Sequence, residues 1–316
     1  MHEHVGLVVY YLEVHFLYAS LVCLAAWALT SMWNGSAAWK YWIWVATLLN
    51  LILPFGGFFD RFGASSVSWA TQLPGLDEVG MQISRHLAAG GVLLAVWLCG
   101  TVFMAGRLIA RLQNDRADAT AAAIAAARRA TELQPSFRAQ GVPVRLSGAE
   151  RGPSVEGVLR PYISLPAGIG RLLSQQELDA VLMHEVTHAR RRDNLVGLLY
   201  EIALCAIWFH PLVWLAGFRL ALFRELSCDD SVIESSRGAD LISAMAKLAG
   251  PGQPQRALRA GAATLFNQRL ARLTTSQPDR TSRVADSLLV ILFSTIFLAC
   301  VLETIAHTGS CFKVHM

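Results

Sequence analysis

The chain has 316 residues, of which 54% are hydrophobic and only 16% are charged. Soluble domains average about 45–50% apolar and about 25% charged residues, so this composition excludes an ordinary soluble protein, a disordered chain and a fibrous protein. The formal net charge is +4, and only three of the 27 basic residues are lysines, which does not indicate direct nucleic-acid binding. The mean hydropathy of +0.41 is typical of a protein that crosses a membrane several times.

Four segments have the length and apolar character of transmembrane helices, which need about 20 residues. They comprise residues 5–33, 41–59, 87–112 and 285–306. The residues before the first segment lack the basic region of a cleaved signal peptide, so we expect this segment to remain as an anchor. The sequence therefore predicts three helices in residues 1–112 and a final helix with a short tail in 285–316.

The distribution of arginine predicts how these helices are oriented. Three arginines lie within residues 107–116 and three within 272–283, whereas the loop 60–86 contains two. Because cytoplasmic flanks carry an excess of Lys and Arg, residues 113–284 are predicted to lie in the cytosol. Counting the crossings then places both chain ends outside, in a multi-pass protein of the inner (plasma) membrane.

The cytosolic region begins with an alanine-rich stretch, 116–132, whose composition favours a helix. Weakly alternating apolar and polar residues at 142–146, 154–159 and 162–165, interrupted by Gly and Pro, predict a small sheet. Ser174 and Glu177 then have the spacing of a capping box and predict the start of another helix. The expected fold is mainly α, a polytopic helical membrane protein with an embedded α+β domain.

The helix after Ser174 contains a metal-binding pattern, Val181-Leu-Met-His-Glu-Val-Thr-His188. His184 and His188 are four residues apart, so both imidazoles lie on one helical face and can share a zinc ion. Glu185 points about 100° away and can act as the general base for a water molecule. The alternative is a pair of surface histidines on an ordinary helix.

A catalytic zinc ion usually has three protein ligands, and Glu225 is the best candidate for the third. Asp229 lies on the same helical face one turn later and can hold a ligating imidazole by its second nitrogen. The alternative is a solvated charged face at the end of an apolar helix.

The apolar stretch 195–223 cannot cross the membrane if Glu225 is to reach the histidines. Pro211 interrupts it, and residues 195–209 and 212–225 each have a rise of about 20 Å, so we expect a helical hairpin over 195–225. Glu201 and His210 lie within this hairpin. Polar groups at such depth are costly unless paired, so each is a functional candidate, with capping or local pairing as the alternative.

These residues resemble the BlaR/MecR-type family of membrane zinc metallopeptidases, which act as sensor-transducers and antirepressors. The similar region extends from about Gly157 to Asp230. It includes the segments Gly157-Val-Leu-Arg-Pro-Tyr-Ile-Ser-Leu-Pro166, His184-Glu-Val-Thr-His188, Trp208-Phe-His-Pro-Leu-Val-Trp214 and Arg224-Glu-Leu-Ser-Cys-Asp229.

The resemblance implies a gluzincin-like domain in which His184, His188 and Glu225 bind one Zn²⁺ per chain and Glu185 is the general base. The family carries an extracellular penicillin-binding sensor after its last span. Since this sequence ends at Met316, we expect a member without that sensor domain.

The expected function is hydrolysis of peptide bonds in a cytosolic or membrane protein, in signal transduction or repressor inactivation. Arg224 and His210 are candidates to stabilise the oxyanion, and an extended substrate can add to the strand edge at 155–165, unless that stretch is a closed hairpin. Two alternatives stay open: a housekeeping protease that processes membrane proteins, and a non-catalytic transducer with structural zinc. The expected partners are a peptide substrate, such as a transcriptional repressor, and the lipid bilayer, with a homodimer as an open alternative to a monomer.

Overall fold

The computed structural model describes residues 2–33, 35–52, 91–129, 138–147, 152–166, 168–249 and 260–275. The described chain is mainly helical with one small sheet, as the sequence predicts. The predicted final span, 285–306, and the loop 60–86 lie outside the described residues.

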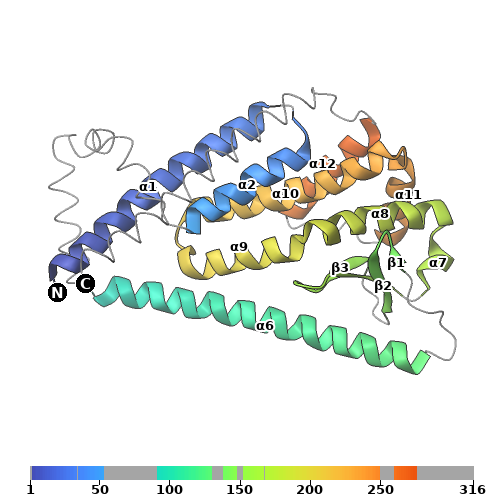
Figure 1. The fold of residues 1–316 in the computed structure, drawn as a ribbon, viewed down its shortest axis with the longest axis horizontal. Coiled ribbons are helices and arrows are strands. Elements are labelled where there is room, and N and C mark those ends of the chain that lie inside the picture. Colours follow the sequence, from blue (N-terminus) through green and yellow to red (C-terminus); the bar gives the residue numbers. More distant parts are fainter. Residues whose placement is uncertain are drawn as a thin grey trace.

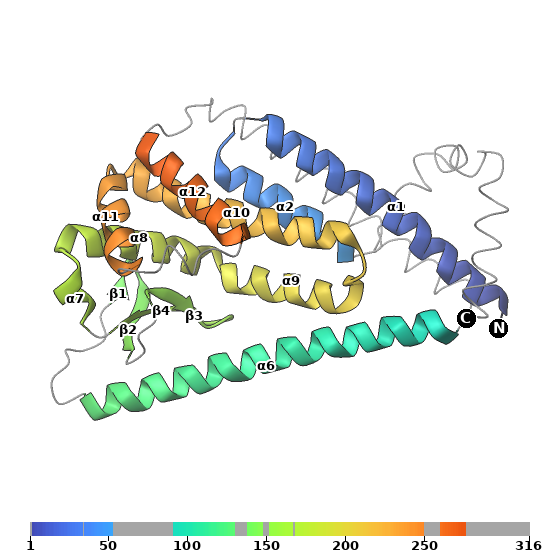
Figure 2. The ribbon, with the colours of Figure 1, turned by 180° about the vertical axis from the view of Figure 1, so that it is seen from behind.

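Three long helices come from the N-terminal part of the chain: α1 (His2–Met32), α2 (Ala37–Ile52) and α6 (Gly91–Arg129). Figures 1 and 2 show α9 and α10 between the pair α1–α2 and the very long α6, which packs against α9. Within the described residues, Leu94–Asn114 of α6 is the one segment both long and apolar enough to cross a membrane, and Ala19–Met32 of α1 is a shorter apolar segment.

Helix α6 differs from the prediction in its extent. The expected span 87–112 and the expected alanine-rich helix 116–132 form one continuous helix of 39 residues, within the described range 91–129. No Gly or Pro follows Gly106 in this helix, so nothing in the sequence interrupts its backbone hydrogen bonding.

The predicted small sheet is confirmed. It consists of β1 (Arg138–Ala139), β2 (Val142–Ser147), β3 (Ser154–Glu156) and β4 (Tyr162–Pro166), in the order β1-β2-β4-β3. Strands β2 and β4 are parallel, and the other pairs are antiparallel. Strand β3 therefore forms one edge of the sheet.

Strand β3 is shorter than the predicted 154–159 because Gly157 turns the chain. Gly157 has a φ of 82°, and a Cβ at this position would lie 2.6 Å from the carbonyl oxygen of Arg160. Only glycine fits such a left-handed, crowded position, so the pairing ends at Glu156.

After α7 (Ile169–Leu172), helix α8 (Gln175–Arg191) begins with the predicted capping box. The Ser174 hydroxyl accepts a hydrogen bond from the Glu177 amide at 3.3 Å, and the Glu177 carboxylate accepts one from the Ser174 amide at 2.7 Å. The apolar side of α8 packs on the sheet in one core, which includes Val144, Ile163, Leu165, Val181 and Val186.

The apolar stretch that follows is divided into α9 (Asp193–Ile207) and α10 (Pro211–Glu234), with Pro211 as the first residue of the second helix. The two helices pack with α1 and α2 in a second core, which includes Cys23, Trp44, Leu48, Leu204 and Val213. Helices α11 (Gly238–Ala249) and α12 (Ala260–Thr275) complete the described chain and pack against α8 and α10.

We predict that Ser174→Ala lowers the free energy of unfolding by about 1 kcal/mol, because an amide at the start of α8 loses its acceptor. Chemical unfolding of the purified protein in detergent, at a fixed metal concentration, measures this change. Ser235→Ala is the control, since the exposed Ser235 hydroxyl donates to a carbonyl inside α10 and caps no free amide. Equal losses for both variants would contradict the assigned role of the capping box.

Candidate metal centre

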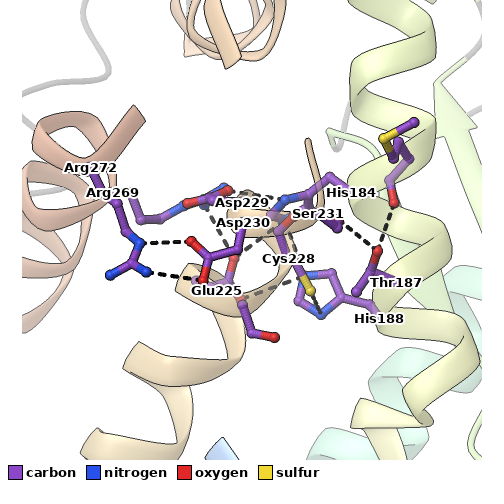
Figure 3. Close-up of polar contacts among 12 residues, drawn as sticks. His184, Thr187, His188, Glu225, Cys228, Asp229, Asp230, Ser231, Arg269 and Arg272 are labelled. Atoms are coloured by element: carbon purple, nitrogen blue, oxygen red, sulfur yellow. Dashed lines mark hydrogen bonds and ion pairs between the residues drawn. The ribbon is translucent and has the colours of Figure 1, made fainter. Parts of the chain in front are cut away.

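Three side chains converge between α8 and α10: His184, His188 and Glu225 (Figure 3). Their ligand atoms all lie within 4.8 Å of one another. The Nε2 atoms of the two histidines are 3.1 Å apart. The Glu225 carboxylate oxygens lie 3.6 Å from Nε2 of His184 and 3.8 Å from Nε2 of His188.

The secondary structure explains this convergence. The two histidines are one turn apart on α8, so their rings project from the same face. Glu225 is reached because the chain turns at Trp208–His210 and α10 then runs back alongside α8. The break before Pro211 therefore brings a carboxylate 37 positions beyond His188 to the histidine pair.

The donor set fits a zinc ion. Two imidazole nitrogens and one carboxylate are a known catalytic zinc set, and zinc–nitrogen bonds of about 2.0–2.1 Å in tetrahedral geometry separate neighbouring ligand atoms by about 3.3 Å. The observed separations, 3.1 to 3.8 Å, are close to this value. The three side chains are also shielded, with His184, His188 and Glu225 exposed by 7%, 12% and 14%.

Local charges favour a cation at this position. Burial lowers the pKa of His184, but hydrogen bonding to Asp229 and Glu225 outweighs burial and raises this pKa to about 9. Burial raises the pKa of Glu225, but hydrogen bonding from His184 and the nearby His188 hold it well below its usual value. Glu225 therefore stays a carboxylate, the form that binds metals.

Asp229, predicted to support a histidine, lies beside His184. Its Oδ1 atom is 3.1 Å from Nδ1 of His184, and its side chain is fully buried, with 0% exposure. Arg269 of α12 compensates this buried charge with two hydrogen bonds to Asp229, both 2.8 Å long, and also lies 3.2 Å from Glu225. Figure 3 shows that the arginines of α12 approach α10 from the side opposite α8.

Two residues that support the site were not predicted from the sequence. Asp193, at the start of α9, lies 2.6 Å from Nδ1 of His188 and so holds the second histidine as Asp229 holds the first. The sequence could have indicated Asp193, because this carboxylate follows His188 by only five positions. Arg269 had no local signal, since it is 40 positions beyond Asp229 and its pairing depends on the packing of α12.

A cleft of about 440 Å³ opens onto the three converging side chains. Glu185, predicted as the general base, lines it together with Arg224, which lies 3.1 Å from Glu225. Burial raises the pKa of Glu185, although the two histidines oppose this shift. The cleft thus contains an acid–base group next to the candidate metal position.

The structure does not bring His210 to this cleft. His210 precedes α10, about 22 Å of helix away from Glu225, and its Nε2 atom lies 3.2 Å from the Ser20 hydroxyl of α1. Glu201 forms an ion pair with Arg111 of α6 at 2.6 Å, so its partner lies on another helix and not at the hairpin turn.

The sequence is similar to known proteins. Residues 12–240 match the protein family described as BlaR1 peptidase M56. Over 85 residues, 27% of this chain and 14% of the relative, the sequence is 36% identical to regulatory protein BlaR1 of Bacillus licheniformis. Over 98 residues, 31% of this chain and 17% of the relative, it is 22% identical to the methicillin resistance mecR1 protein of Staphylococcus aureus.

A shorter match links the chain to a further protease. Over 48 residues, 15% of this chain and 14% of the relative, the sequence is 38% identical to the protease HtpX homolog of Archaeoglobus fulgidus. The matched segments cover 14% to 17% of the lengths of these three relatives.

We predict about one zinc ion per purified wild-type chain, and a sharp loss of zinc in His184→Ala and in Glu225→Ala, because each variant removes one of three converging donors. Metal analysis by mass spectrometry measures the content. His210→Ala is the matched control and should keep its zinc, since His210 lies at the hairpin turn. Full zinc content in Glu225→Ala would show that another group is the third ligand.

Proposed function

Because the chain belongs to the BlaR1 peptidase M56 family, we propose that it is an integral-membrane zinc metalloendopeptidase that hydrolyses peptide bonds of a cytosolic or membrane protein. The observation that carries the proposal is the convergence of His184, His188 and Glu225 on a cleft that also contains Glu185. A purely structural zinc site usually has four protein ligands and has no use for a base beside it.

In the proposed reaction, His184, His188 and Glu225 bind zinc, with Asp229 holding the ring of His184. When bound, zinc supplies a Lewis acid that polarises the peptide carbonyl and promotes ionisation of water. Glu185 accepts a proton from the attacking water and donates a proton to the departing amine as the C–N bond breaks. Burial around Glu185 raises its pKa, which suits a group that must both accept and release a proton near neutral pH.

The sheet supplies a place for an extended substrate. Strand β3 is at the edge of the sheet, and Ser154 and Val155 line the cleft. Asn194 of α9 donates hydrogen bonds to the carbonyl oxygens of Val155 and Gly157, at 3.0 and 3.1 Å, and thereby holds this edge next to the metal centre. We propose that the substrate pairs with β3 and that Arg224 donates to the carbonyl oxygen under attack.

We also propose that the protein is multi-pass, with the domain limits 1–112, 113–284 and 285–316 and the zinc site on the cytosolic side. Arg111, near the C-terminal end of the apolar segment Leu94–Asn114, lines the cleft. Tyr41, at the start of α2, bonds to Asp193 beside His188. The C-terminal end of the apolar segment of α6 and the N-terminal part of α2 are both predicted to be cytosolic, and both contact the region of the metal site.

The hairpin α9–α10 is proposed to dip into the bilayer. Its turn lies beside the opposite end of the apolar segment of α6, where the Trp97 indole donates to the Ala206 carbonyl at 3.0 Å. Large apolar side chains around the turn are exposed and would contact lipid; they are Ile202, Phe209, Trp214 and Phe218. The zinc site would then lie near the cytosolic membrane surface.

The substrate is proposed to be a regulatory protein, such as a transcriptional repressor. Two relatives are named as a regulatory protein and a resistance protein, which supports signal transduction more than housekeeping proteolysis. A proteome-wide comparison of protein N-termini between cells with the wild type and cells with Glu185→Gln would identify the cleaved protein and decide between these roles.

We predict that Glu185→Gln keeps its zinc but lowers the rate of peptide cleavage by about 10²- to 10⁴-fold, because the variant loses the base and keeps the ligands. The rate is measured on the substrate found by the N-terminal comparison, with zinc content measured in parallel. Glu234→Gln, an exposed position at the end of α10, is the matched control. Near-normal cleavage by a zinc-loaded Glu185→Gln protein would show that Glu185 is not the base. Near-normal signalling without cleavage would favour a transducer with structural zinc.

The topology proposal predicts that single cysteines at Gln140 and Ala260 are labelled from the same, cytosolic, side of the membrane. Membrane-impermeant maleimide, applied to right-side-out and inverted vesicles of a cysteine-free background, reports the side. Labelling from opposite sides would mean that residues 195–223 cross the bilayer and would separate Glu225 from the histidines.

A further inference from the structure

Tyr41, from the N-terminal part of the chain, contacts Asp193, the residue that holds the candidate zinc ligand His188. Tyr41 lies in the second turn of α2 and is 1% exposed. Its hydroxyl donates a 2.9 Å hydrogen bond to Oδ1 of Asp193. The other carboxylate oxygen of Asp193, Oδ2, lies 2.6 Å from Nδ1 of His188. One carboxylate therefore joins α2 to His188.

Arg191 binds the same carboxylate. Its guanidinium donates to both oxygens of Asp193, each at 2.6 Å, and its charge lies over the Tyr41 ring, 4.2 Å from the ring centre. Arg191 is itself fixed to α10, where it donates to the Ser227 hydroxyl at 2.7 Å and to the Arg224 carbonyl at 3.0 Å. The tyrosine ring and hydroxyl thus complete a buried cluster of Tyr41, Arg191, Asp193 and His188.

Tyr41 differs from the other partners of Asp193 in its distance along the sequence. Within the described residues, His188 and Arg191 are the other side chains hydrogen-bonded to Asp193, and both lie within five positions of it. Tyr41 comes from 152 positions earlier. It is therefore the donor whose bond to Asp193 depends on how α2 packs against α9 and α10.

This arrangement has a direct effect on the imidazole. A carboxylate that accepts the Nδ1 proton of a histidine fixes the tautomer, leaves Nε2 free for a metal and orients the ring. The carboxylate can do this only if it is itself held in place. The Tyr41 hydroxyl and the Arg191 guanidinium both bind Oδ1, the oxygen that His188 does not use. Tyr41 therefore adds to Arg191 a restraint on rotation of the carboxylate that comes from α2.

We propose that Tyr41 is a positioning residue for the metal site, acting on His188 through Asp193, so that the packing of α2 sets the affinity for zinc. The proposal rests on the proposed function, in which His188 is a zinc ligand. It makes α2 a route by which an event in the membrane region changes the metal site without contacting it.

The test measures zinc affinity by chelator competition on the full chain in detergent. Tyr41→Phe keeps the ring next to Arg191 and removes only the hydroxyl, and we expect the zinc dissociation constant to rise about three- to tenfold. Asp193→Asn should raise it about 10- to 100-fold. The matched control is Tyr162→Phe, which removes another tyrosine–carboxylate hydrogen bond, to Glu156 in the sheet, and should leave the affinity unchanged.

Two further readouts separate positioning from a general loss of stability. The visible spectrum of the cobalt-substituted protein should change in Tyr41→Phe and not in Tyr162→Phe, because the spectrum reports ligand geometry. In a double-mutant cycle, Tyr41→Phe should have little further effect on zinc affinity once Asp193 is Asn, since the proposed route passes through that carboxylate. Additive effects, or an affinity and spectrum equal to the wild type in Tyr41→Phe, would overturn the proposal.

Linkage provides a measurement that needs no substitution at Tyr41. If α2 packing favours zinc binding, zinc must favour α2 packing to the same degree, so zinc should slow hydrogen exchange in residues 37–52 of the wild type. Asp193→Asn should remove this zinc-dependent protection. No zinc-dependent change in a zinc-loaded wild type would refute the coupling, whereas a wild type that binds no zinc would refute the proposed function instead.

Discussion

The structure around the cleft depends on the need to neutralise buried carboxylates. A carboxylate removed from water is strongly destabilising unless it is paired and hydrogen-bonded. The buried Asp229 is bound by Arg269 and the buried Asp193 by Arg191, and Arg272 binds the partly exposed Asp230 in the same way. These pairs connect α12 to α10 and fix the end of α8 to the start of α9. Asp193 and Asp229 therefore have two roles. Each holds a candidate ligand on α8, and each forms an ion pair that fixes neighbouring helices to one another.

Local parts of this arrangement could be predicted from the sequence. Helical spacing, which can be read from the sequence, determines three of these features. They are the histidine pair, the shared face of Glu225 and Asp229, and the capping box at Ser174. The turn before α10 followed from Pro211, because proline cannot continue a helix. The expectation that Glu225 returns to His184 predicts a hairpin over 195–225, and α9 and α10 do pack against each other there.

The remaining parts could not be predicted because they depend on tertiary packing. Arg269 reaches Asp229 from another helix, and Tyr41 reaches Asp193 across 152 positions, so neither pair has a local pattern. His210 stood next to the Pro211 turn in a motif-like segment, yet the length of α10 separates it from the cleft. The sequence also divided α6 into two elements at a change in composition, although composition can change along a helix without interrupting its hydrogen bonds.

If α6 crosses the bilayer as proposed, its unbroken length would connect the thickness of the membrane to the region of the cleft. At 1.5 Å per residue, its 39 residues are about 58 Å long, and the apolar segment Leu94–Asn114 accounts for about 31 Å of this length. Helices adjust to a thinner or thicker membrane mainly by tilting. A tilt of about 10° about the end of the apolar segment, Asn114, would move the far end of α6, about 22 Å further on, by about 4 Å if the helix stays straight. Helix α6 also packs on β2. A displacement of α6 would therefore also displace the sheet that borders the cleft.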